Sequence, residues 1–195
     1  DTPYVIGVSA TINTNGHTLA ATKSGAIQVT GTGKLYLTGG GLIIGKKGSG
    51  VEVQSGGFLS VVEPTPSIKG TTYGLDIASG AEVHLSGGTY EGSTAAIRVA
   101  NDNFGALLED GCAYYDEGGN WIPPENMATA KKVIVKQCTD HSKECVPNRG
   151  LPTHDWTCSI CGATGTEECT FGFEQGTTGT CGSCNNEITV AVDRE

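Results

Sequence analysis

The chain is poor in aromatic, methionine and charged residues. Of its 195 residues, 6% are aromatic, 17% are charged and one is methionine, while 37% are hydrophobic. That hydrophobic share is too high for a disordered chain, and the lack of long segments with helical periodicity excludes a helical bundle. No apolar run reaches the roughly 18 residues of a transmembrane helix, so we predict no membrane span. The net charge is -9 and basic clusters are missing, so we predict that nucleic acid is not a partner.

Glycine, by contrast, is abundant, with 30 residues, and it separates the segments of a repeat of about 24 residues. Short segments with apolar residues at alternating positions return at this spacing, which is the pattern of half-buried strands. The first set consists of Ile27–Val29, Val51–Val53, Leu75–Ile77 and Ile97–Val99. The second set consists of Leu35–Leu37, Leu59–Val61 and Val83–Leu85. We expect a third column at Ile44 and Ile68.

A fixed period of this length is typical of a solenoid. We therefore predict an all-β protein in which residues 1–137 form a right-handed parallel β-helix of about four to five coils, closed by a hairpin. The first and third residues of each three-residue segment would point into the solenoid and stack on their equivalents in the next coil at about 4.8 Å. An antiparallel sandwich is the alternative, because turn signals every 8 to 12 residues or so also suit it. The strict spacing of the repeat argues against the sandwich.

Cysteine is concentrated near the C-terminus, where seven of the eight cysteines lie between residues 138 and 184. Four of them form two C-x-x-C pairs, Cys158 with Cys161 and Cys181 with Cys184, a spacing typical of tetrahedral zinc sites. Two histidines lie in the same segment. We predict that residues 138–195 form a small zinc-ribbon-like module with two structural zinc ions. The predicted ligands are Cys138, His141, His154, Cys158, Cys161, Cys169, Cys181 and Cys184.

Two groupings of these ligands are open. In the ribbon grouping, the four cysteines of the C-x-x-C pairs share one ion, and Cys138, His141, His154 and Cys169 share the other. In the interleaved grouping, Cys138 and His141 join Cys158 and Cys161, while His154 and Cys169 join Cys181 and Cys184. Cys145 is the spare thiol in both groupings, although it could replace either histidine.

A disulfide framework is the alternative to zinc, because small exported domains are often cross-linked in that way. Two features argue against it. Cysteines in C-x-x-C pairs form strained, reducible bridges more often than structural ones. The two histidines would also have no role.

The outer face of the predicted β-helix carries a column formed by Gln28, Glu52, Asp76 and Arg98. Two carboxylates and a guanidinium on neighbouring coils could serve a polysaccharide lyase or hydrolase. The alternative is an ordinary charge ladder in which Arg98 compensates Asp76. A catalytic face would need further acidic groups, so we predict no catalysis here. Glycan binding is the other option, because sugars are held by exposed aromatic rings next to polar groups. The candidate rings are Tyr36, Phe58, Tyr73 and Tyr90.

Several motifs resemble those of a known family. Segment 15–19, with the sequence NGHTL, and segment 87–90, with GGTY, look like coil turns of pectin-lyase-like β-helices. Segment 111–121, with GCAYYD followed by GNW, is similar to a hairpin that closes such helices in secreted proteins of anaerobic gut bacteria. Cys/His modules spaced like the one here often follow in those proteins.

The resemblance implies a secreted or cell-surface bacterial protein. We expect a non-catalytic module that faces a glycan or a component of the host or cell surface. It would act as a monomer or as part of a longer exported chain.

Overall fold

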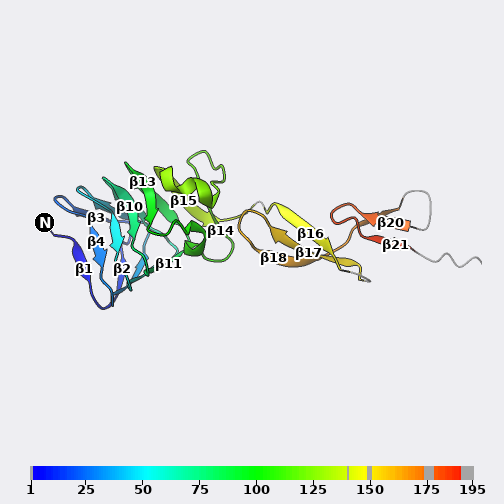
Figure 1. The fold of residues 1–195 in the computed structure, drawn as a ribbon, viewed down its shortest axis with the longest axis horizontal. Coiled ribbons are helices and arrows are strands. Elements are labelled where there is room, and N and C mark those ends of the chain that lie inside the picture. The colour runs from blue at the N-terminus through cyan, green and yellow to red at the C-terminus, as the bar shows by residue number, and fades with distance from the viewer. Residues whose placement is uncertain (1, 140, 149–150, 174–177, 190–195) are drawn as a thin grey trace, which may run out of the picture. The chain divides into compact units, whose positions relative to one another are not determined.

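A computed structural model describes residues 2–139, 141–148, 151–173 and 178–189 (Figure 1). The chain divides into two compact units, Asp1–Cys138 and Thr139–Glu195, called here the solenoid unit and the C-terminal unit. Among the described residues, no helix has the length and apolar character needed to cross a membrane.

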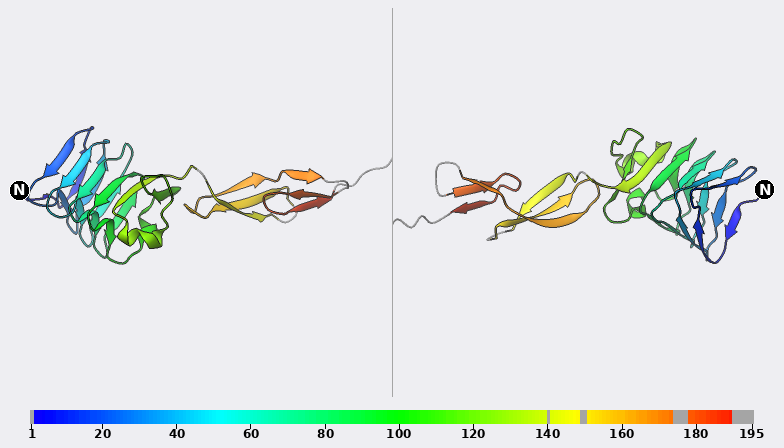
Figure 2. Two further views of the ribbon diagram at one scale, coloured as in Figure 1. Left: turned by 90° about the horizontal axis from the view of Figure 1, so that it is seen from above. Right: turned by 180° about the vertical axis from the view of Figure 1, so that it is seen from behind.

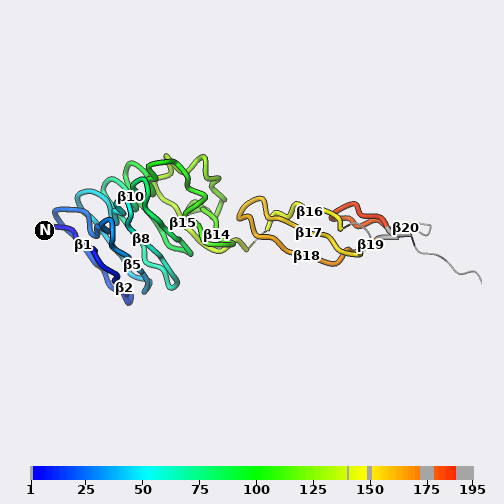
Figure 3. The backbone as a smooth tube through the Cα atoms, turned by 60° about the horizontal axis from the view of Figure 1, so that its bottom comes forward, coloured from blue at the N-terminus to red at the C-terminus, as the bar shows by residue number. Residues whose placement is uncertain are grey.

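The solenoid unit has about four turns, each with three short strands (Figures 2 and 3). Every turn adds one strand to each of three sheets. The first sheet contains β1 (Tyr4–Ile6), β4 (Ile27–Val29), β7 (Val51–Val53), β10 (Tyr73–Ile77) and β13 (Ala95–Val99). The second contains β2 (Ser9–Asn13), β5 (Lys34–Thr38), β8 (Phe58–Val61) and β11 (Glu82–Leu85). The third begins with β3 (Thr18–Ala21), β6 (Leu42–Gly45), β9 (Ser67–Gly70) and β12 (Gly88–Gly92).

The register of these strands follows the sequence repeat. Ile27 pairs with Val51, Val51 with Leu75 and Leu75 with Ile97, always in parallel. The predicted inward residues of the first two sheets are all buried, and Leu35, Leu59 and Leu75 have no exposed surface. The prediction of an all-β parallel β-helix is therefore confirmed, and the antiparallel sandwich is wrong.

The prediction for the third column was wrong by one residue in β6. Ile43, not Ile44, pairs with Ile68, and both members of this pair are fully buried. Ile44 instead pairs with Lys69 on the outer side. The turn that leads into β9 spans residues 62–66 and is longer than the turn at residues 39–41 that leads into β6. An added residue shifts the register by one position, which moves each side chain to the other face of the strand.

An antiparallel strand closes the solenoid. β15 (Lys132–Gln137) pairs with β12 on one side and with β14 (Cys112–Tyr115) on the other, both antiparallel. Two short 3-10 helices, η1 (Phe104–Leu107) and η2 (Pro124–Thr129), lie between these segments in sequence. The buried Tyr114 donates a hydrogen bond of 2.7 Å to the carbonyl of Phe104. The reversal covers the last parallel strand of the third sheet, whose backbone groups would otherwise be unpaired.

The C-terminal unit contains two small antiparallel sheets (Figure 1). The first consists of β16 (Lys143–Pro147), β17 (Thr153–Cys158) and β18 (Thr164–Glu168). The second consists of β19 (Phe171–Phe173), β20 (Thr178–Cys181) and β21 (Glu187–Thr189). Apart from one glycine, the buried side chains in the described part of this unit are those of His154, Cys158, Cys181 and Cys184. Among the residues that the structure describes, the buried hydrophobic cluster lies in the solenoid unit.

A charge placed in an inner column should abolish the solenoid. Leu59 and Ser60 are neighbours on β8, and Leu59 has no exposed surface whereas Ser60 lies on the outer side. We expect Leu59→Asp to prevent folding, because an unpaired carboxylate in a dry stack costs several kcal/mol. Ser60→Asp should fold normally. Far-UV circular dichroism and urea unfolding measure both variants, and a cooperative wild-type transition for Leu59→Asp would contradict the assignment of this column.

Candidate metal centres

The eight predicted ligands lie in two groups of four. The first cluster consists of Cys138, His141, Cys158 and Cys161, and the second of His154, Cys169, Cys181 and Cys184. In each cluster the four ligand atoms all lie within 4.8 Å of one another. This is the interleaved grouping, and the ribbon of four cysteines does not form in the described part of the chain.

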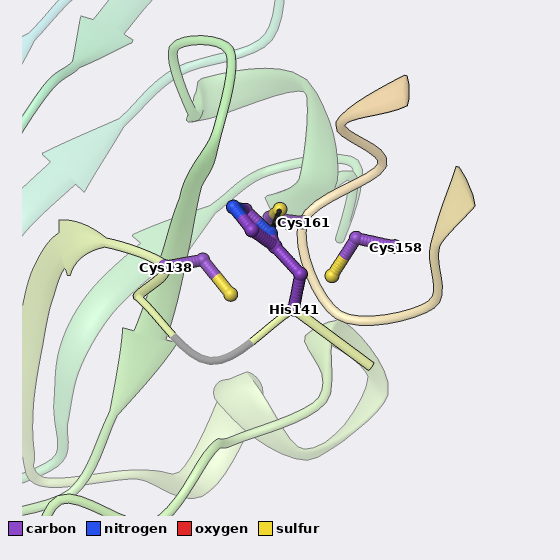
Figure 4. Close-up of side chains that lie close together, drawn as sticks. All are labelled: Cys138, His141, Cys158 and Cys161. Carbon is purple, nitrogen blue, oxygen red and sulfur yellow. Dashed lines mark hydrogen bonds between the residues drawn. The ribbon is translucent and has the colours of Figure 1, made fainter. Parts of the chain in front are cut away.

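The first cluster is built around the turn that joins β17 to β18 (Figure 4). Cys158 ends β17 and Cys161 lies in the turn. Gly162 follows with a φ of 73°, a conformation that glycine adopts without strain, and its N–H donates to the carbonyl of Cys158 at 2.9 Å. His141 brings Nδ1 to 3.4 Å from the Cys161 sulfur. Cys138 directly follows β15.

The second cluster repeats this arrangement with different elements. Cys181 ends β20 and Cys184 lies in the following turn. Asn185 takes the place of the glycine, with a φ of 57°, and its N–H donates to the carbonyl of Cys181 at 2.9 Å. Asparagine is among the few other residues that tolerate this conformation. Asn185 was not among the residues predicted from the sequence, although its position directly after a C-x-x-C pair was a usable signal.

The remaining two ligands of the second cluster come from the other end of the first sheet. His154 lies near the start of β17, and Cys169 directly follows β18. Nδ1 of His154 is 3.4 Å from the Cys169 sulfur, which is itself 3.6 Å from the Cys184 sulfur. The second cluster therefore draws ligands from both sheets of the C-terminal unit.

These separations fit a tetrahedral metal site. With zinc–sulfur bonds of about 2.3 Å and zinc–nitrogen bonds of about 2.0–2.1 Å, the edges of the tetrahedron measure roughly 3.6 Å from nitrogen to sulfur and about 3.8 Å between sulfurs. The observed 3.4 and 3.6 Å are close to these edges. A disulfide needs sulfurs about 2.05 Å apart. None of the eight cysteines, all of which lie within the described ranges, forms a disulfide.

The leading cysteine of each C-x-x-C pair has a low thiol pKa. Burial raises the pKa of Cys158, but hydrogen bonds from the backbone of Cys161 and Ile160 and from the His141 side chain outweigh burial and lower it to about 6. For Cys181, hydrogen bonds led by the backbone N–H of Ser183 lower the pKa to about 6. Thiolate is the form that binds metal. The backbone of each turn therefore favours the ligand form.

Trp156 lies between the two clusters in sequence, on the same face of β17 as His154 and Cys158. Its ring centroid is 5.4 Å from that of His141. Gly165 pairs with Trp156 across the sheet, and a Cβ at this position would come within 2.7 Å of the indole. The glycine therefore makes room for the only tryptophan of the C-terminal unit.

The two remaining cysteines lie outside the clusters. Cys145 is half-buried on β16, where it pairs with Trp156. Cys112 is buried in the solenoid unit, where its thiol donates to the carbonyl of Ser86 at 3.4 Å. Burial raises the pKa of the Cys112 thiol, which makes it less reactive.

The column formed by Gln28, Glu52, Asp76 and Arg98 holds one ion pair and a hydrogen bond from a neutral amide. Arg98 binds Asp76 with Nε and Nη2, at 2.6 and 2.5 Å. Gln28 donates to Glu52 at 3.4 Å. Two cavities in the described part of the solenoid unit are lined by other residues, including His84 in one and Lys132 in the other.

Three of the four candidate glycan-binding rings lie at the surface or are only partly buried. Tyr36 is 37% exposed, and its ring centroid is 5.4 Å from that of Phe58, which is 5.5 Å from that of His84. The prediction for Tyr90 was wrong, because this side chain is fully buried and its hydroxyl donates to the carbonyl of Gly87. Tyr73 lies under the guanidinium of Arg98, at 5.2 Å.

No known protein family, curated protein or solved structure matches the chain. The β-solenoid of about four turns and the two Cys/His clusters are features of the structure itself. The resemblance to pectin-lyase-like proteins of gut bacteria stays an expectation drawn from sequence motifs.

Paired cysteine substitutions distinguish the two ligand groupings. The double variant Cys138→Ser, Cys158→Ser lacks two ligands of the first cluster. We expect the first cluster to lose its ion and the second to bind its ion with wild-type affinity. The double variant Cys158→Ser, Cys184→Ser lacks one ligand in each cluster and should lower the affinity of both clusters for their ions. Native mass spectrometry with a competing chelator counts the bound ions. The ribbon grouping predicts the reverse pattern for the two double variants.

Proposed function

We propose that this chain is a non-catalytic module of a secreted or cell-surface protein, in which two structural zinc ions hold the C-terminal unit and the solenoid unit faces a glycan. One observation carries the zinc assignment. The buried non-glycine side chains in the described part of the C-terminal unit are all candidate ligands, one histidine and three cysteines.

The ligand chemistry favours zinc. Each cluster offers three thiols and one imidazole, a Cys3His set common in structural zinc sites. Thiolate ligands select zinc or iron–sulfur clusters over magnesium, calcium or manganese. Four protein ligands complete a tetrahedral shell, whereas catalytic zinc keeps one position for water or substrate. The role that fits both clusters is therefore structural.

The C-terminal unit also needs a cross-link to fold. A segment this short cannot bury enough apolar surface to offset its chain entropy. Structural zinc contributes about 10–16 kcal/mol in small metal-binding domains, which is enough to decide folding.

We therefore expect two zinc ions per chain. Chelation should expose the cysteines of the C-terminal unit to a thiol reagent, while the solenoid unit keeps its strand signal in circular dichroism. Elemental analysis and native mass spectrometry of the purified chain give the stoichiometry. A non-reduced mass lower by two hydrogens for each linked cysteine pair, with no metal bound, would refute the zinc assignment.

The proposed glycan-facing surface lies on the second sheet of the solenoid unit. Tyr36, Phe58 and His84 follow one another on β5, β8 and β11, and ring faces of this kind support sugars by stacking. Polar groups flank the row. His84 contacts Glu82 through Nε2 and Glu109 through Nδ1, each at 2.9 Å. The hydrogen bond with Glu82 raises the pKa of His84 above its ordinary value.

We expect this surface to bind glycans without turning them over. The wild-type chain should bind some of the glycans on an array. Tyr36→Ala should lose this binding, whereas Tyr73→Ala, which changes a residue of the first sheet, should keep it. Polygalacturonate should yield no unsaturated uronide with or without calcium, because Arg98 is engaged with Asp76. Absence of any ligand would contradict the glycan-facing role. Product formation that depends on Arg98 would support the alternative, a polysaccharide lyase or hydrolase at Glu52, Asp76 and Arg98.

A further inference from the structure

The imidazole of His154 has one engaged and one unsatisfied nitrogen. The residue is 3% exposed, and its Nδ1 faces the Cys169 sulfur at 3.4 Å. Its Nε2 is buried and has no hydrogen-bond partner. A neutral histidine that binds metal through Nδ1 carries its proton on Nε2, and a buried N–H without an acceptor is unfavourable.

Glu167 is placed to accept that proton. It lies directly opposite His154 in the pairing of β17 with β18, so both side chains are on the same face of the sheet. Oε2 of Glu167 is 3.9 Å from Nε2 of His154. An approach of about 1 Å gives an ordinary hydrogen bond.

The other oxygen of Glu167 is already engaged. Lys143 on β16 forms an ion pair with Oε1 of Glu167, and its ammonium also lies 4.6 Å from the Trp156 ring centroid. Lys143 therefore holds the carboxylate over this face of the sheet and leaves Oε2 toward His154.

We propose that Glu167 is a positioning residue of the second cluster, which accepts a hydrogen bond from Nε2 of His154 and so presents Nδ1 to the metal. Carboxylate partners of this kind fix the tautomer and orientation of a ligating histidine and raise its basicity. The inference rests on the proposed metal binding. The proposal concerns the second cluster alone, because His141, the histidine of the first cluster, is only half-buried.

The test uses the full chain loaded with zinc and titrated with a competing chelator. We expect Glu167→Gln to lower the zinc affinity of the second cluster by about 10- to 100-fold and to leave the zinc affinity of the first cluster unchanged. Glu168→Gln is the matched control, because Glu168 is the next residue on β18, is also exposed, and pairs with Thr153 instead of His154. The control should keep both affinities.

Nitrogen-15 NMR of the histidine side chains gives a second readout that a general loss of stability would not reproduce. In the zinc-loaded wild type, His154 should show a protected proton on Nε2. In Glu167→Gln this proton should shift and exchange faster with water, while the signals of His141 stay in place.

Equal weakening of both ions, an equal effect of Glu168→Gln, or an unchanged His154 signal would each overturn the assignment of Glu167. A wild-type chain that binds no metal would instead refute the proposed zinc binding.

Discussion

The C-terminal unit is constrained by its lack of a hydrophobic core in the described part of the chain. The side chains buried there are those of histidine and cysteine, which are potential metal ligands. A domain without such a core cannot offset the entropy of ordering its chain. In the account proposed here, metal ions bound at the four-ligand clusters at the two ends of the β17–β18 hairpin would provide the cross-links instead. The backbone around each C-x-x-C pair is arranged accordingly, since Gly162 and Asn185 take the left-handed conformation at equivalent positions.

The solenoid unit draws its stability from a different source. Its inner columns of Leu, Ile and Val stack from turn to turn, and residues such as Leu35, Leu59 and Val83 repeat one environment. Each turn covers the apolar side of the previous turn, so these side chains are buried by one another. The outer faces carry different side chains, with an ion pair on the first sheet and a row of rings on the second.

The sequence repeat was sufficient to predict the strands and inward residues of the first two sheets, because side-chain alternation and a constant spacing determine both. It failed at Ile43, where a longer turn in the next coil shifts the register. The eight candidate ligands were also readable from spacing, but their grouping depends on strand pairing. Lys143 pairs with Cys158, so the chain that carries His141 enters beside that cysteine. Cys169 leaves β18 at the end where His154 lies, and leads to Cys181 and Cys184. Ligand spacing alone does not contain this order of strands.

The most direct test is a crystal structure of the purified chain, with diffraction data collected on both sides of the zinc absorption edge. The account predicts two anomalous peaks per chain. One should lie among Cys138, His141, Cys158 and Cys161, and the other among His154, Cys169, Cys181 and Cys184, each with four protein ligands. Electron density that joins the cysteine sulfurs in pairs, with no anomalous peak at either cluster, would contradict it.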